Sequence, residues 1–431
     1  MNNELLETVK KAGADAWEIQ ENKETGWEFY FIRHSLDQNR VVDVTHTIVK
    51  LYKRSADGKR IGSAQAELAP TSSKEEWAVE LQKLLKAASL GTSENYDLVS
   101  VQESEPAAAD FVKDPLENMG KEFITMMKEI PETATEDINS YEIFTKVSEV
   151  SYWNSNGVSL TQKVPSSFLE VVVDARNERH EIELYRSYRG GGCDRTMIGD
   201  DLKRAMKMGR DRLHTVPTPK LGSYPVVFTT SDAVAFYNFF LQQLSADAVY
   251  GKMSQFSIGK NICIDEKAGG DHLTMRAVKE LANSSANALF DTDGALIRDE
   301  TLLEDNVPVH FWGSRQFAQY LGLKDAFRVG NYVAGGGTHE DRDLAAQDYL
   351  EPVEFSDFQV ENNGDFFGEI RLAYWHHGNE VTPVSGGSVS GNVLKLLGSL
   401  AMSRQQKQYD HALIPAWTKL EEVTVSGVED R

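Results

Sequence analysis

The sequence contains few cysteines, no long apolar run and fewer basic than acidic residues. Two of its 431 residues are cysteines, Cys193 and Cys263, which excludes a disulfide framework for a chain of this size and favours two reduced thiols over a single bridge. The most apolar stretches, such as VAFYNFFLQQL, are broken by polar residues, whereas a membrane-spanning helix needs about 20 apolar residues. The first residues have neither the basic nor the apolar region of a signal peptide. We therefore expect a soluble, cytoplasmic protein.

The charge balance excludes further classes. The chain has 66 acidic and 45 basic residues, a formal net charge of -21. A nucleic-acid binder needs a basic surface to displace phosphate counterions, and an anionic membrane also attracts basic segments. Direct contact with nucleic acid or with a membrane is therefore not expected. The hydrophobic content of 41% is ordinary for a globular protein, and the length predicts two domains.

Apolar periodicity and end signals predict four helices in the first 215 residues. Ser73 and Glu76 form a capping box, and Asp114 followed by Pro115 is typical of a helix start, with the proline as the first helical residue. Gly13 is placed to end the first helix. The first expected helix is short, contains Leu5, Leu6 and Val9 and ends with Lys10 and Lys11. The other three cover approximately residues 73–91, 114–130 and 196–214.

The segments between these helices are rich in β-branched and aromatic residues, which predicts strands. Asp57-Gly58 and Asn156-Gly157 are hairpin turn signals. The polar stretch 92–113 is expected to be a connection. The expected strands are WEIQE, WEFYFIRHS, RVVDVTHTIVKLYKR and three runs between residues 140 and 190.

The segment TVPTPKLG, residues 215–222, predicts a boundary between domains 1–216 and 217–431. After it, YPVVFTT predicts a short buried strand, followed by one helix over 231–250 that the cluster Thr230-Ser231-Asp232 would cap. This helix is apolar on nearly all sides, so we expect it in the interior of the second domain. The remainder is rich in strands and glycine, with one helical patch over 313–321. The order of elements predicts an α+β fold with two α+β halves.

Glycine-rich and serine-rich segments give little indication of catalysis. The triplets Gly190–Gly192 and Gly335–Gly337 match neither a P-loop nor a dinucleotide-binding motif, so flexible turns are favoured over phosphate binding. The segment SVSGN, residues 388–392, lacks the spacing of a hydrolase nucleophile elbow and is expected to be a loop.

Histidine and cysteine also provide no strong catalytic motif. A zinc protease needs a second histidine about one turn after its His-Glu pair, and neither His180-Glu181, in a strand-like run, nor His339-Glu340 has one. His376-His377 would point to opposite faces of a strand. Cys193 follows glycines at a helix start, but no histidine partner can be assigned, so a buried or incidental thiol is favoured.

Over nearly its full length the chain resembles the TldD/PmbA family, whose members are described as modulators of DNA gyrase and as peptide-maturation metalloproteases. LLETVKKAGADAWEIQE resembles the family's first helix, turn and strand, and SYWNSNGVSLTQKVPSSFLEVVV resembles a family hairpin. LGSYPVVFTTSDAVAFYNFFLQQLSADAVYGKMS resembles the strand and helix that open the family's second domain. Further similar segments are FDTDGALIRDETLLEDNVPVHFWGSRQFAQYLGL, PVSGGSVSG and EEVTVSG.

The resemblance implies a two-domain α+β architecture with mixed and antiparallel sheets and a buried helix at the start of the C-terminal domain. Catalytic members carry HExxxH on that helix and a C-terminal cysteine as a further zinc ligand. Here the corresponding positions are Tyr237, Asn238 and Gln242, and the last cysteine is Cys263. The resemblance therefore implies no metal or cofactor in this chain, with zinc expected only in a catalytic partner.

This pattern is similar to the PmbA (TldE-like) branch, which implies a non-catalytic subunit that handles peptides as a homodimer or as a heterodimer with a zinc-bearing TldD-like subunit. Two alternatives stay open. One is a peptide-binding homodimer or scaffold without proteolysis, to which the gyrase-modulator description would apply. The other is a hydrolase with an unassigned site, involving Cys193 or the pair His376-His377. Whether the chain is itself an enzyme is left open by the sequence.

Overall fold

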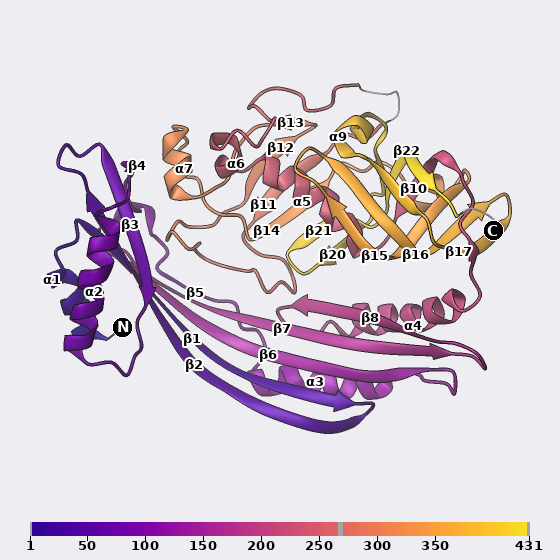
Figure 1. Ribbon diagram of the computed structural model, residues 1–431, viewed down its shortest axis with the longest axis horizontal. Coiled ribbons are helices and arrows are strands. Elements are labelled where there is room, and N and C mark those ends of the chain that lie inside the picture. Colours follow the sequence, from indigo (N-terminus) through magenta and orange to yellow (C-terminus); the bar gives the residue numbers. More distant parts are fainter. Residues whose placement is uncertain (1, 266–269, 429–431) are drawn as a thin grey trace.

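The structure is a computed structural model that describes residues 2–265 and 270–428. Within that part of the chain, the strands form three sheets, and helices and strands do not alternate in a regular βαβ order. This confirms the predicted α+β class. A long curved sheet is built from residues 16–190. Two further sheets, built from residues after 215, lie over its hollow side (Figure 1).

The curved sheet owes its shape to four antiparallel strands of 17 to 20 residues. The predicted runs WEIQE and WEFYFIRHS form one continuous strand, in which Gly26 allows a close approach to the next strand. A side chain there would come within 2.7 Å of the Thr145 carbonyl oxygen. Both predicted hairpin turns are confirmed. The strands are β1 (Ala16–Ile32), β2 (Ser35–Arg54), β3 (Arg60–Glu67), β4 (Ser93–Glu94), β5 (Ala108–Asp110), β6 (Glu136–Asn154), β7 (Ser159–Arg176) and β8 (Glu181–Gly190).

Strand β7 contains a proline in its middle. On one side β7 pairs with β6 throughout, and on the other it pairs with β5 at residues 161–163 and with β8 from Ser167 onward. Pro165 lies in the interval that neither β5 nor β8 covers. Because proline has no N–H to donate, it is compatible with the sheet in this interval, where no partner strand on that side needs a hydrogen bond from it.

Four helices cover the curved sheet, two near each end. The predicted capping box of Ser73 and Glu76 is confirmed, and Gly13 has the positive φ expected after the first helix. The predicted cap at Asp114 is wrong by one residue: the third helix begins at Leu116, because Pro115 is still extended, with a ψ of 146°. The helices are α1 (Asn3–Lys11), α2 (Lys74–Ala88), α3 (Leu116–Glu129) and α4 (Arg195–Arg212), with a short 3-10 turn η1 (Val101–Glu103) in the predicted connection.

The second sheet closes on itself, because β15 pairs with both β10 and β16. The prediction of a loop at 388–392 is wrong, since these residues form β18 between β16 and β22. Val389 is fully buried there, and Gly391 lies so close to Phe366 that a side chain would come within 2.8 Å of its ring. The strands are β9 (Val216–Pro217), β10 (Gly222–Phe228), β15 (Tyr349–Val360), β16 (Asp365–His377), β17 (Glu380–Ser385), β18 (Ser388–Asn392), β19 (Ala401–Met402) and β22 (Thr418–Ser426).

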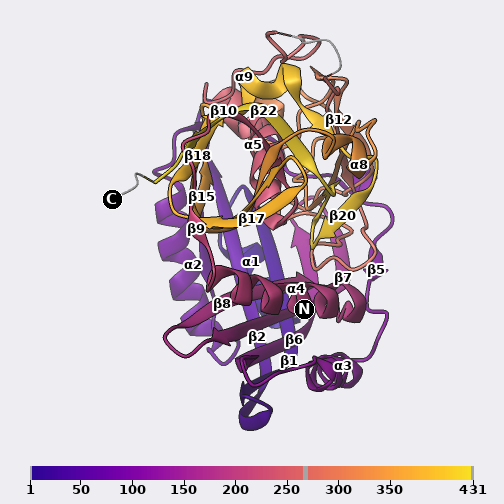
Figure 2. The same ribbon diagram turned by 90° about the vertical axis from the view of Figure 1, so that its right-hand side faces the viewer.

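The third sheet lies on the other side of the helix α5 (Val234–Gln243) from the second sheet (Figure 2). Its strands are β11 (Thr274–Val278), β12 (Glu300–Glu304), β13 (Val307–Pro308), β14 (Asn331–Gly335), β20 (Gln406–Tyr409) and β21 (Ala412–Pro415). The short helix α7 (Arg315–Tyr320), as predicted near 313–321, connects β13 to β14. Between β14 and β15 lies α8 (Asp341–Leu344), and between β18 and β19 of the second sheet lie α9 (Val393–Leu396) and the 3-10 turn η3 (Leu397–Ser399). None of the helices in the part of the chain described has both the length and the apolar character needed to cross a lipid bilayer.

The helix predicted over 231–250 lies in the interior as expected, but it is not one helix. It consists of η2 (Ser231–Ala233), α5 (Val234–Gln243) and α6 (Ala246–Tyr250). The break occurs because Ser245 caps α6 by accepting a hydrogen bond from the Ala248 N–H, while the Ala246 N–H donates to the carbonyl of Trp312. Thr230 does lie at the N-cap position of η2, but its side chain accepts no hydrogen bond from the helix, and its hydroxyl instead donates to Asp232.

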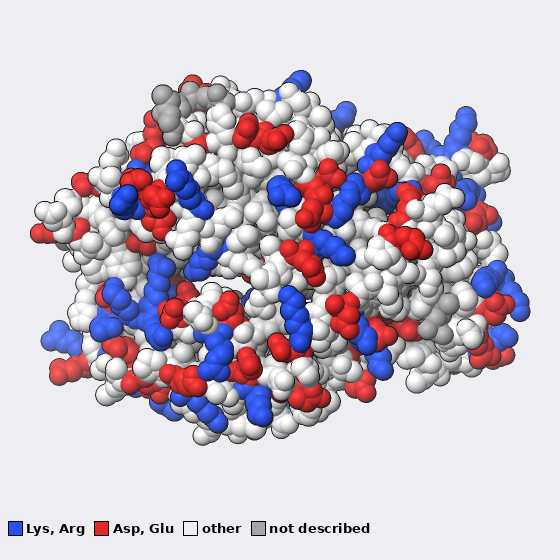
Figure 3. Space-filling view, turned by 180° about the vertical axis from the view of Figure 1, so that it is seen from behind, with Lys and Arg blue, Asp and Glu red and all other residues white. Residues whose placement is uncertain are grey.

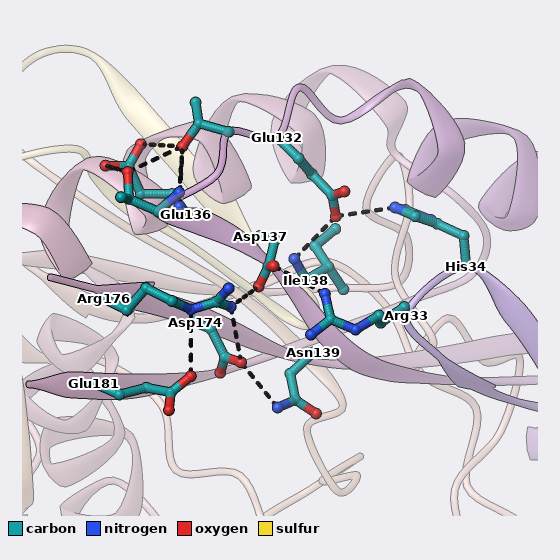
Figure 4. Close-up of polar contacts among 12 residues, drawn as sticks. Arg33, His34, Glu132, Glu136, Asp137, Ile138, Asn139, Asp174, Arg176 and Glu181 are labelled. Atoms are coloured by element: carbon teal, nitrogen blue, oxygen red, sulfur yellow. Dashed lines mark hydrogen bonds and ion pairs between the residues drawn. The ribbon is translucent and has the colours of Figure 1, made fainter. Parts of the chain in front are cut away.

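A network of ion pairs and hydrogen bonds connects the strands at one end of the curved sheet (Figure 4). Asp137 of β6 lies at its centre and contacts Arg176 at 2.6 Å and Arg33 at 2.9 Å. Arg176 also contacts Asp174 and Glu181. Burial alone would raise the pKa of Asp137, but the two arginines more than offset it and hold this pKa below its ordinary value. The network therefore ties together the ends of β1, β6, β7 and β8.

We expect Asp137→Asn to lower the free energy of unfolding at pH 7 by about 1–3 kcal/mol, because it removes a buried charge that two arginines share. A carboxylate whose pKa is lowered on folding stabilises the protein above the unfolded pKa of about 4, and this contribution is lost as the pH falls through the lower folded value. The difference between the two proteins should therefore shrink below about pH 4. Urea unfolding at several pH values measures it.

Glu129→Gln is the matched control, because Glu129 forms an exposed ion pair with Arg195. Its effect should stay within about 0.5 kcal/mol at every pH. Equal effects of the two substitutions, or an Asp137→Asn effect that does not change with pH, would contradict a stabilising role of the Asp137 charge.

Candidate functional site

The position predicted to correspond to the first histidine of the motif, Tyr237, is part of the core. Its side chain is 1% exposed, and its hydroxyl lies 2.7 Å from the Thr418 hydroxyl of β22. Burial raises the pKa of Tyr237, with a further contribution from the charge of Asp271. The phenol therefore stays neutral and holds α5 against the second sheet.

The other two positions, Asn238 and Gln242, face outward from α5. The Asn238 amide oxygen accepts a hydrogen bond of 2.8 Å from the Tyr332 hydroxyl of β14. Tyr237 and Gln242 are five residues apart, so their side chains are rotated by about 140° about the helix axis. The structure thus brings Asn238 close to the third sheet but does not make the three side chains converge.

Zinc is held in proteins by thiolate, imidazole or carboxylate groups. A buried phenol and two outward-facing amides do not fit this ion. Among residues 2–265 and 270–428, no group of three or more His, Cys, Asp or Glu side chains is arranged to hold a metal.

The histidine pair lies in β16, and each ring has its own partners. His376 lies 3.1 Å from Glu351 and stacks on Tyr349, whereas His377 contacts Thr382. The sequence predicted His180 in a strand, but it lies in the turn before β8. These contacts assign the pair to packing of the second sheet.

Cys193 is partly buried, with its sulfur 3.8 Å from the Met126 sulfur. Burial raises the pKa of the Cys193 thiol to about 12. The glycines before it do not form an anion site, because the Asp194 carboxylate caps α4 by accepting from the Met197 N–H. At the second triplet, a side chain on Gly337 would come within 2.3 Å of the Ser403 carbonyl, so close backbone packing accounts for this glycine.

A central cavity of about 440 Å³ lies where the two halves of the chain meet. This volume is in the range of small-molecule and cofactor sites. Val234, one turn before Asn238 on α5, lines it, and His411 of its wall contacts the Tyr332 ring, so α5 and the cavity are directly linked. The cavity is lined by residues 185–189 of β8, by Met197, Asp201, Arg204 and Met208 of α4, by 230–232 and Val234, by 353–355 of β15, and by Lys407 and 409–411.

Ion pairs between the halves form the polar walls of the cavity. Arg186 of β8 contacts Glu354 at 2.9 Å, and Arg204 of α4 contacts Glu351 at 3.2 Å. Burial alone would raise the pKa of Glu351, but hydrogen bonds from His376 and Thr229 and the charge of Arg204 hold this pKa below its ordinary value.

Burial is the main influence on the pKa values of two other groups in the cavity, Asp232 and Lys407. Burial raises the pKa of Asp232 and lowers the pKa of Lys407. The walls thus combine satisfied ion pairs with groups that are poorly solvated.

Sequence reasoning missed this cavity, because its residues come from five separate segments. The only local indication is the alternation of tyrosine and arginine in YRSYR, residues 185–189.

Comparison with known proteins supports the same architecture. The family profile described as PmbA/TldA metallopeptidase C-terminal domain matches residues 221–427. Among curated proteins, none matches the chain.

Three solved structures share the fold over nearly the whole length of both chains. TldE from Thermococcus kodakarensis has 15% identity and a TM-score of 0.75, with 98% of this chain and 99% of that chain covered. A putative modulator of DNA gyrase from Thermotoga maritima has 16% identity and a TM-score of 0.74, with 98% of each chain covered. A second such modulator, from Bacteroides thetaiotaomicron, has 17% identity and a TM-score of 0.77, with 98% and 97% covered.

The second half of the chain is thus similar to a C-terminal domain found in metallopeptidases, and the similarity of fold extends over the first half as well. The match places residues 221–427 in the TldD/PmbA family, and the chain as a whole shares the fold of the three solved structures.

The raised pKa of Cys193 gives a direct prediction. At pH 8 a thiol with a pKa of about 12 is almost entirely protonated, and the thiolate is the reactive form. We expect iodoacetamide to label Cys193 at least ~100-fold more slowly in the folded protein than in urea. Mass spectrometry of digested samples, taken over time, measures the rate at this residue separately from Cys263. Equal rates with and without urea would contradict the burial argument.

Proposed function

We propose that this protein is the non-catalytic, PmbA/TldE-like subunit of a cytoplasmic peptide-processing system and carries no zinc of its own. Its role is to bind peptide and to complete a dimer with a zinc-bearing TldD-like subunit. The chain's own residues perform no bond cleavage in this proposal. They bind and orient a peptide in the central cavity beside α5.

One observation carries the proposal: the three motif positions on α5 hold residues that cannot replace two imidazoles and a general base. Tyr237 is committed to the core through Thr418, and Asn238 is committed to Tyr332. A neutral amide cannot take a proton from water, and amides are poor zinc ligands. A family member with this helix is therefore best explained as the partner of a catalytic chain.

Direct binding to DNA is not part of this proposal. The net charge is -21, and on the face in Figure 3 basic and acidic side chains are interspersed without one large basic patch. A homodimer that binds peptides without a catalytic partner is the alternative, and the experiments below separate it from the heterodimer.

The zinc content of the purified protein tests the central claim. We expect less than ~0.1 zinc per chain by elemental analysis after purification without added metal, because the α5 positions offer no zinc ligand. The protein alone should also leave denatured casein uncut. One zinc per chain, or zinc-dependent cleavage, would overturn the proposal.

A second prediction concerns the partner. Mixed with an HExxxH-bearing homologue from the same organism, the chain should form a heterodimer in size-exclusion chromatography with light scattering, and casein cleavage should appear. Because Asn238 and Gln242 are exposed on α5, Asn238→Ala with Gln242→Ala should reduce this cleavage by roughly tenfold without unfolding the protein.

Gln65→Ala, an exposed position on β3, is the control and should leave cleavage unchanged. A double variant with full cleavage would show that this face of α5 has no role. A chain that elutes only as a homodimer in the presence of the homologue would favour the alternative function.

A further inference from the structure

Most charged groups of the central cavity have a bonded partner, but two cations that line it form no ion pair in the part of the chain described. These are Lys407 and Arg189, and the Arg189 guanidinium lies 3.9 Å from the centre of the Phe168 ring. Arg186 has Glu354 and Arg204 has Glu351, as described above. Asp201 accepts a hydrogen bond of 2.8 Å from the Tyr188 hydroxyl and lies 4.0 Å from Arg186. Of the two cations without an ion pair, Lys407 of β20 is the more buried, since Arg189 is exposed.

Lys407 has an aromatic neighbour but no bonded carboxylate. Its ammonium group lies 5.0 Å from the centre of the Tyr409 ring, and in the described part of the chain no carboxylate oxygen lies within 4 Å of it. Burial and the charge of Arg204 lower its pKa, while the charge of Asp201 acts in the opposite direction. The protonated amine is thus incompletely neutralised, and an anion placed beside it would be stabilised.

The surface around Lys407 is largely apolar. Met197 and Met208 of α4, Val234 of α5, and Val353 and Phe355 of β15 line the same cavity. Methionine and aromatic side chains accommodate apolar groups of different shapes. A ligand that fits this wall therefore combines one negative charge with an apolar body.

We propose that the central cavity binds a carboxylate carried by an apolar residue, with Lys407 as its counter-ion. The C-terminal residue of a peptide has this chemistry, and a small aromatic acid shares it. The choice of a peptide as the source rests on the proposed function, whereas the carboxylate site does not depend on the presence or absence of zinc.

Isothermal titration calorimetry with three probes tests this site: N-acetyl-Ala-Ala-Phe with a free carboxylate, its C-terminal amide, and 3-phenylpropanoate. We expect the peptide acid to bind at least about tenfold more tightly than the amide, because only the acid forms a charge-assisted contact with Lys407. If 3-phenylpropanoate binds as tightly as the peptide acid, the carboxylate site stands and its source is a small acid. Equal binding of peptide acid and amide, or no binding of any probe, would overturn the proposal.

Variants locate the effect at Lys407. Lys407→Gln should bring the affinity for the acid down to that for the amide, and Lys407→Arg should restore most of the preference because it keeps the charge. Lys324→Gln, an exposed lysine outside the cavity, is the matched control and should leave the preference unchanged. Thermal unfolding of each variant shows that the fold is intact. An unchanged preference in folded Lys407→Gln would assign the carboxylate to another group and overturn the inference.

A failed zinc test would overturn the non-catalytic role and leave the carboxylate preference in place. A failed carboxylate test with a zinc-free chain would leave that role in place and remove only the site at Lys407.

Discussion

The apolar core shared by the two halves of the chain is the constraint on which the rest of the structure depends. Tyr152, Val158 and Leu160 of the curved sheet belong to the same buried cluster as the helix α5 and the strands around it. Burial of a large apolar side chain is worth about 1.5–3 kcal/mol, so separating the halves would cost many such contributions. The position of α5, and with it that of the central cavity, follows from this packing.

Polar groups inside the shared core fix how the halves meet. The buried Gln162 side chain of β7 accepts hydrogen bonds from the backbone N–H groups of Leu289 and Phe290. A buried polar group without its partner costs free energy, so these bonds favour one relative placement of the halves. Beyond the apolar core, ion pairs connect the two halves and line the cavity.

Local sequence signals predicted local structure well. The capping box at Ser73, the turn at Asn156-Gly157 and the α+β class depend on neighbouring residues and were confirmed. The strand at 388–392 and the break after Gln243 were missed, because partners distant in sequence decide both. The central cavity was missed for the same reason. The predicted assignment of Tyr237, Asn238 and Gln242 to the motif positions rests on resemblance, and the structure adds their contacts.

Pro165 has a consequence for the assembly of the whole chain. On the side opposite β6, no strand pairs with β7 at this residue, so the sheet has a gap there. Pro165, Gly191 and Gly192 line a small cavity of about 140 Å³ at this gap. Asn283 from the second half reaches this place: its carbonyl accepts from the Gly191 N–H, and its amide donates to the Gly192 carbonyl at 3.1 Å. A residue that cannot donate a hydrogen bond thus leaves an opening in the first half, and Asn283 of the second half binds there.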